Sequence, residues 1–161
     1  MTGRVLFVLV PLHRLRAHEQ VVPSKVRALE DELRREGIFV DPIWVARGTG
    51  VILNGHHRVA ALRKLGARRI PAWVLDYESD LVRLERWTPG PPISKKEVVR
   101  RAREGKLFSP QTTRHRLAVE LPRRPTPLAQ LLAVPRPKAA KAHAPRSGSA
   151  RRSRARSPGS A

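Results

Sequence analysis

The stretch VILNGHHRVAALRKLG, residues 51–66, decides the fold because it changes from a strand pattern to a helix pattern within a few residues. Its apolar start is typical of a short buried strand, and three apolar residues then recur at helical spacing up to Gly66: Val59, Leu62 and Leu65. Between the two patterns stand one Asn, one Gly, two His and one Arg. A strand-to-helix turn needs only a capping residue and a glycine, so the imidazoles and the guanidinium require a separate explanation.

Strand and helix patterns alternate on both sides of this turn. Helices are predicted at 24–36, with Ser24 as N-cap and Gly37 as stop, at 56–65, and from the capping box SKKE at 94–97 to Gly105. Strands are predicted at 4–10, 41–47, 50–53, 70–77, 81–87 and 116–121. We therefore expect a small α/β (α+β) domain with a mixed sheet over residues 1–121.

Residues 122–161 have a different composition. They hold 10 of the 33 Lys and Arg and no acid, so half of the net charge of +20 lies there. Pro, Ala and Ser dominate, and only LAQLLAV at 128–134 suggests a short helix. Such a segment cannot bury enough apolar surface to offset its ordering entropy, so we predict a mostly disordered basic tail.

The composition excludes several chemistries and favours anionic partners. The chain has no cysteine, which excludes disulfides, thiolate metal sites and Cys nucleophiles. The N-terminal apolar run VLFVLV is too short to cross a bilayer, so a cytoplasmic protein without membrane contact is expected. The positive charge favours nucleotides, nucleic acid or phosphorylated metabolites without choosing among them.

The turn at 54–58 is a candidate phosphate site. A helix N-terminus presents free backbone N–H groups, Gly55 permits close approach, and Arg58 can fork onto phosphate oxygens. His56 and His57 can add donors or a proton relay. The alternative is structural: Asn54 as N-cap, Gly55 as turn residue and surface polar residues after them. Composition and spacing leave both open.

Three segments together resemble the ParB/sulfiredoxin-like superfamily. LNGHHRVAALRKLGARRIPAWVLDY, residues 53–77, is similar to its Gly-x-x-Arg nucleotide turn. LRAHEQV at 15–21 and SKKEVVRRAREGKLFSPQTTRH at 94–115 resemble segments of its free L-serine kinase-like group. Sulfiredoxins carry a catalytic Cys where His56 stands, and the chain has no Cys, so that branch is excluded. True ParB proteins carry a Glu-Arg-Arg turn and a downstream helix-turn-helix domain, and neither is found in the sequence. The resemblance implies a small ParB N-terminal/sulfiredoxin-like domain.

The resemblance also implies roles for individual residues. Glu19 matches the general base that takes the serine hydroxyl proton, with His57 as a second catalytic residue. The phosphate-binding positions are Asn54, Gly55, His56, His57, Arg58, Thr112, Thr113, Arg114 and His115. Trp87, Thr113 and His115 are implied for the substrate. Mg²⁺ with ATP or ADP is the implied cofactor, held through the nucleotide and at Asn54. Apart from the resemblance, Asp76, Glu78 and Asp80 follow the strand predicted at 70–77 and are a weaker candidate set for magnesium bound through water. His13 and His18 show no ligand spacing.

One departure from the family pattern keeps a second hypothesis open. The turn begins with Asn54 where the family has Asp, and Ser109 and Gln111 replace a Pro and a Lys. If that acid serves the chemistry, turnover is weak or absent. The leading hypothesis is a kinase that converts L-serine, or another small hydroxy-amino acid, to its phosphate ester, with the nucleotide donor and the oligomeric state undetermined. The alternative is a non-enzymatic ParB-like regulator that binds nucleotide and, weakly, nucleic acid through its basic tail.

Overall fold

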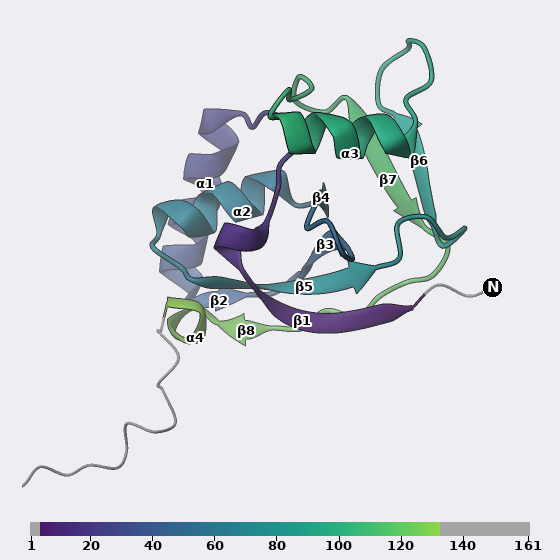
Figure 1. The fold of residues 1–161 in the computed structure, drawn as a ribbon. Coiled ribbons are helices and arrows are strands. Elements are labelled where there is room, and N and C mark those ends of the chain that lie inside the picture. The colour runs from purple at the N-terminus through teal and green to yellow at the C-terminus, as the bar shows by residue number, and fades with distance from the viewer. Residues whose placement is uncertain (1–3, 133–161) are drawn as a thin grey trace, which may run out of the picture.

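The sheet is built around β5 (Arg69–Leu75), in a computed structural model that describes residues 4–132. β5 pairs antiparallel with β1 (Val5–Pro11) along its whole length and parallel with β3 (Ile43–Ala46). β3 in turn pairs antiparallel with β4 (Ile52–Asn54), which gives the strand order β1-β5-β3-β4 (Figure 1). The predicted mixed sheet is confirmed.

Two helices cover one end of this sheet. α1 (Pro23–Glu36) and α2 (His56–Lys64) lie side by side in Figure 1 and enclose the larger of the two hydrophobic clusters. Val59 and Leu62 of α2 are buried against Ile43 and Ile70 of the sheet, as the helical spacing predicted. The start of α2 is therefore fixed by its own apolar face.

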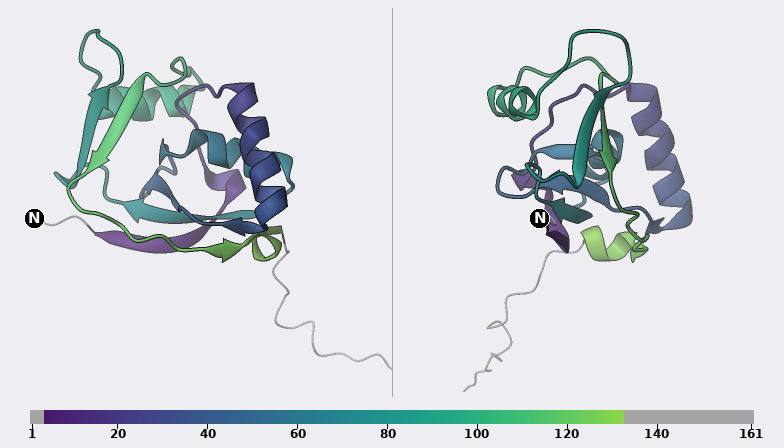
Figure 2. Two further views of the ribbon diagram at one scale, coloured as in Figure 1. Left: turned by 180° about the vertical axis from the view of Figure 1, so that it is seen from behind. Right: turned by 90° about the vertical axis from the view of Figure 1, so that its right-hand side faces the viewer.

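The other end of the sheet carries a two-stranded ribbon and one helix. β6 (Val82–Arg86) pairs antiparallel with β7 (Thr113–Leu117), and α3 (Lys95–Glu104) packs beside them over the second cluster. Figure 2 shows this unit and α1 on opposite sides of the domain. The capping box is confirmed, because Ser94 Oγ accepts a hydrogen bond from Glu97 N at 3.1 Å.

The ordered part of the chain continues beyond the predicted boundary at Leu121. β8 (Thr126–Pro127) pairs with β2 (Ile38–Phe39), and α4 (Leu128–Leu132) follows directly. Leu131 is fully buried, and its carbonyl accepts a hydrogen bond from Arg68 N at 2.8 Å. These few apolar residues order the segment because they fill the main core. The rest of the predicted tail, 133–161, lies outside the described residues.

Two local predictions were wrong. α1 begins at Pro23 with Val22 as N-cap and no side-chain cap, since proline at the first position presets the helical φ, so Ser24 lies inside the helix. The last predicted strand, 116–121, starts earlier, at Thr113.

A short 3₁₀ turn, η1 (Leu12–Arg14), follows β1. Within residues 4–132, no helix combines the length and apolarity needed to cross a bilayer.

Candidate active site

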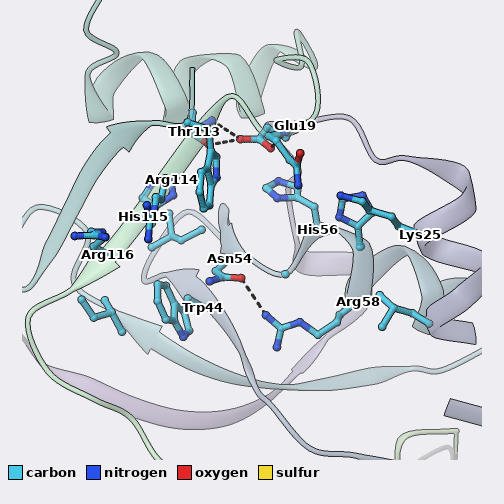
Figure 3. A pocket seen from close by; sticks show the side chains of 17 residues that line it. Glu19, Lys25, Trp44, Asn54, His56, Arg58, Thr113, Arg114, His115 and Arg116 are labelled. Atoms are coloured by element: carbon cyan, nitrogen blue, oxygen red, sulfur yellow. Dashed lines mark hydrogen bonds between the residues drawn. The ribbon is translucent and has the colours of Figure 1, made fainter. Parts of the chain in front are cut away.

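A cavity of about 750 Å³ opens where the start of α2, the segment after η1 and the inner face of β7 meet (Figure 3). Its lining includes most of the residues that the sequence singled out: Glu19, Asn54, Gly55, His56, His57, Arg58, Trp87, Thr113, Arg114 and His115. Lys25 and Arg116 also line it, so four cationic side chains face one carboxylate. The cavity therefore suits an anionic ligand.

The segment that carries Glu19 is anchored by backbone hydrogen bonds on two sides. Arg16 exchanges hydrogen bonds with the 50–52 turn, at 2.8 Å to Gly50 O and 2.9 Å from Ile52 N. Phe108 N donates to His18 O at 2.8 Å, and Gln20 N donates to Phe108 O at 2.9 Å. The segment thus crosses between the sheet and the connection from α3 to β7.

His56 and His57 hold this same segment from the third side. The Nε2 atom of His56 accepts a hydrogen bond from His18 N at 3.1 Å, and the Nε2 atom of His57 accepts one from Val22 N at 3.0 Å. Two consecutive imidazoles at a helix start therefore fasten the Glu19 segment to α2. The Nε2 atom of His57 is thus engaged as an acceptor, and the proton relay expected of this residue stays a prediction.

The accepting role requires both rings to be neutral at Nε2, and the surroundings favour this. Burial lowers the pKa of His56 well below its ordinary value, and the neighbouring His18 and His115 lower it further. Burial also lowers the pKa of His57, with a smaller contribution from Lys25. The cations of the cavity are thus Lys and Arg.

Glu19 is held by both of its oxygens. Oε1 accepts from Gln111 N at 3.0 Å, and Oε2 accepts from Thr113 N at 2.8 Å and from the Thr113 hydroxyl. Gln111 adopts a left-handed conformation, with φ of 57°, at this point of the chain. Glu19 is 9% exposed, so a residue that the sequence alone suggests is a surface acid is part of the buried site.

A layer of buried histidines lies behind Glu19. The rings of His18 and His56 are 4.5 Å apart between centroids, and those of His18 and His115 are 5.6 Å apart. His115 Nε2 is hydrogen-bonded to the hydroxyl of Tyr77 at 2.7 Å. The sequence analysis set His18 aside, because its partners come from distant segments that no spacing rule connects.

Arg58 and Asn54 form a hydrogen-bonded pair at the N-terminal end of α2. Arg58 Nη2 donates to Asn54 Oδ1 at 3.0 Å, and Nη1 donates to Pro42 O at 3.2 Å and to Asp41 O. Burial lowers the pKa of Arg58, an effect that Asp41 opposes, and at neutral pH the guanidinium stays charged. Asn54 is therefore not the helix cap; the N-cap is Gly55, with φ of 116°.

The outer wall of the cavity is formed by the β6–β7 ribbon. The Arg114 guanidinium carbon lies 4.3 Å from the ring centroid of Trp87, whose side chain is 53% exposed. Trp87 is thus a rim residue. Thr112 does not line the cavity, because its hydroxyl donates to Ser109 O at 2.7 Å.

The predicted acidic set lies elsewhere. Asp76, Glu78 and Asp80 belong to the turn after β5 and do not line the cavity, and Asp76 Oδ1 accepts from Glu78 N at 3.2 Å. In the described part of the chain, no group of three or more His, Cys, Asp or Glu is arranged to hold a metal ion.

Known proteins are similar to this chain in sequence and in fold. No protein-family model matches the chain. It is 37% identical to an ADP-dependent L-serine kinase of Thermococcus kodakarensis over 107 residues, which are 64% of this chain and 44% of the relative. It is 40% identical to an ATP-dependent L-serine kinase of Desulfurococcus mucosus over 87 residues, 52% of this chain and 34% of the relative. The matches thus span less than half the length of these relatives.

The fold comparison agrees with the sequence comparison. A free serine kinase variant solved in complex with ADP superposes with a TM-score of 0.72 at 21% identity, over 78% of this chain and 93% of that chain. The resemblance expected from the sequence is confirmed. By sequence and by fold, the chain is similar to L-serine kinases.

Proposed function

We propose that the chain is a nucleotide-dependent kinase that transfers a phosphoryl group to the hydroxyl of free L-serine. The observation that carries the proposal is the placement of Glu19, with both oxygens held by donors, on the same cavity as the start of α2. The named activities of its relatives support it, since they are ADP- and ATP-dependent L-serine kinases. Phosphoryl transfer needs mainly positioning and counter-charge, and the cavity has both.

The nucleotide phosphates bind at the start of α2 in this proposal. The first backbone N–H groups of a helix have no partner within it, and no side chain caps α2. Gly55 keeps this end open, and Arg58 and Lys25 add positive charge. His56 and His57 contribute by fixing the geometry, because their Nε2 atoms are used by the Glu19 segment.

Serine binds on the side of the β6–β7 ribbon. Arg114 is the cation there that can receive the serine carboxylate, and Trp87 shields it from water. Thr113 and His115 are buried with their polar groups engaged by Glu19 and Tyr77, so they shape this end instead of binding the ligand through those groups. Glu19 takes the hydroxyl proton as the serine oxygen attacks the terminal phosphorus, and the bridging P–O bond breaks to release the nucleotide with one phosphate fewer.

Magnesium fits the site as an ion carried by the nucleotide. Mg²⁺ is commonly held by phosphate oxygens, water and one or two protein oxygens, and the cavity offers Asn54 Oδ1. When bound, the ion neutralises charge on the phosphates. Asn54 Oδ1 already accepts from Arg58, so coordination there would compete with this hydrogen bond.

The test is phosphoserine formation from free serine with ATP, ADP or CTP as donor. Glu19→Gln should lower turnover by about 10²–10⁴-fold, the usual contribution of a general base, with nucleotide affinity nearly unchanged. Glu30→Gln is the matched control, because Glu30 is also 9% exposed but lies on α1 outside the cavity. Equal loss of affinity and rate, or full activity of Glu19→Gln, would contradict the base role.

A second function is proposed for the basic tail, on grounds of charge. Eight of its cations follow Leu132 and no acid accompanies them. We propose weak binding of polyanions without sequence preference, with a slope of about −0.9 in log K per log salt for each DNA phosphate neutralised. Because the core extends past Leu121, the tail should be removed after Leu132.

Mobility-shift titrations at two salt concentrations should show loss of most DNA or RNA retention in the truncated chain, with kinase activity unaffected. Equal retention by both chains would place the nucleic-acid site on residues 1–132. Absence of phosphoserine with every donor, combined with that result, would favour the ParB-like regulator.

A further inference from the structure

His18 is a fully buried side chain that is connected to the proposed base, Glu19, through the hydroxyl oxygen of Thr113. Its Nε2 atom lies 2.9 Å from Thr113 Oγ1, and Thr113 Oγ1 contacts Glu19 Oε2. The direct distance from His18 Nε2 to Glu19 Oε2 is 3.9 Å. The three side chains therefore form a hydrogen-bonded chain, His18–Thr113–Glu19, in which the threonine hydroxyl contacts both the imidazole and the carboxylate.

The hydroxyl of Thr113 has only one proton to give. Glu19 Oε2 accepts hydrogen bonds in the pattern of an ionised carboxylate, so its contact with Oγ1 uses that proton. The contact with His18 then needs a proton on Nε2, because two lone pairs would otherwise face each other. The remaining ring nitrogen, Nδ1, has no hydrogen-bond partner of good geometry.

The charge state of His18 is consistent with a single ring proton. Burial lowers the pKa of His18 to about 4, and an interaction with the backbone of Ile52 opposes part of this decrease. The titratable groups that face the ring are Glu19, His56 from α2 and His115 from β7. At neutral pH the ring is neutral and carries one proton.

We propose that His18 is a positioning residue for the base: it donates from Nε2 to Thr113 and so commits the Thr113 hydroxyl to Glu19. The proposal rests on the kinase function proposed above. It also names the atom that reacts. Oε2 is occupied by two donors from Thr113, whereas Oε1 accepts only from Gln111 N, so the serine proton goes to Oε1. Glu19 becomes neutral in this step, the serine oxygen bonds to the terminal phosphorus, and the bridging P–O bond of the nucleotide breaks, so that the nucleotide leaves with one phosphate fewer.

Two substitutions at His18 separate this role from packing. Gln can place an amide donor close to the position of Nε2, whereas Leu fills the buried space without a donor. A packing role predicts that Leu is better tolerated than Gln in both stability and activity. The proposal predicts the opposite order for turnover: His18→Leu lowers kcat roughly 10- to 100-fold, as for a buried hydroxyl left without one of its partners, and His18→Gln retains most of it. KM for the nucleotide stays unchanged in both.

Substitutions at Thr113 provide the second arm. Thr113→Val should lower kcat by a similar factor, Thr113→Ser should restore it, and adding His18→Leu to Thr113→Val should cost little more. Tyr77→Phe is the matched control, because it removes another buried hydroxyl that contacts a histidine Nε2 but does not touch Thr113. Multiplying losses in the double variant, or a Leu variant as active as the Gln variant, would overturn the proposal.

The position of the ring proton can be measured without any kinase activity. In ¹⁵N-histidine-labelled protein at neutral pH, His18 should show a protonated Nε2 and an unprotonated Nδ1. A proton on Nδ1 would refute the proposal even in an active enzyme. If the wild-type protein forms no phosphoserine with any donor, the proposed kinase function is wrong. The ¹⁵N measurement then still decides whether His18 donates a hydrogen bond to Thr113.

Discussion

Replacing Gly55 by alanine should distort the start of α2 by two separable effects. The first is backbone strain, since Gly55 has φ of 116° and a left-handed conformation costs an L-residue about 1–2 kcal/mol. The second is steric: an added Cβ would lie 2.4 Å from Cγ2 of Ile43, which is fully buried. Overpacking of this kind costs about 1–3 kcal/mol, so the total loss in unfolding free energy is about 2–5 kcal/mol.

Gly48→Ala provides the matched control for this substitution. Gly48 also has a positive φ, of 87°, but nothing lies within 4 Å of its added Cβ, so only the strain of about 1–2 kcal/mol applies. Urea unfolding followed by tryptophan fluorescence measures both variants. Because His56 and His57 follow Gly55, its variant should also lose kinase turnover, whereas Gly48→Ala should retain it. Equal stability of the two variants would refute the steric argument.

Three further changes test the charges of the site. Folding lowers the pKa of His18 to about 4 and that of His115 to about 3, so below pH 6.5 the unfolded chain binds more protons than the folded one. In urea titrations, the contribution of these two rings to stability should be complete above pH 6.5 and fall by up to ~3 kcal/mol per pH unit towards pH 4, and a stability that is constant over this range would contradict it. Asn54→Asp should raise turnover if the family's acid serves the chemistry, and an unchanged rate would make the departure neutral. Arg58→Ala should weaken nucleotide binding by about 1.5–3 kcal/mol in titration calorimetry, whereas unchanged affinity would leave Arg58 a purely structural residue.

The parts of the fold that the sequence predicted are those fixed by neighbouring residues. The helix ending at Gly37, the cap at Ser94 and the stop at Gly105 depend on contacts within one turn, and all three are confirmed. β7 was misplaced because its buried positions are Thr113 and His115, which do not form an apolar alternation. Its inward residues are polar because they contact Glu19 and Tyr77.

The candidate site was predicted as a set of residues but not as an arrangement. Glu19 and the 54–58 turn were identified by similarity to a family. The direction of each hydrogen bond, in contrast, depends on segments that meet only in the folded chain. The acceptor role of His57 is an example, because its partner is the backbone of Val22. Backbone partners leave no mark on the sequence, so no pattern of residue types could have indicated this contact.

The distance along the chain between Glu19 and its donors has a consequence for folding. Gln111 and Thr113 follow Glu19 by 92 and 94 residues, so the base acquires its surroundings only when the two ends of the domain have met. Closing so long a loop is slow compared with forming a helix, and activity should therefore return last during refolding. The exposed connection at 87–92 lies between these ends. Two fragments divided there would each contain half of the base's environment, and kinase activity would report their association.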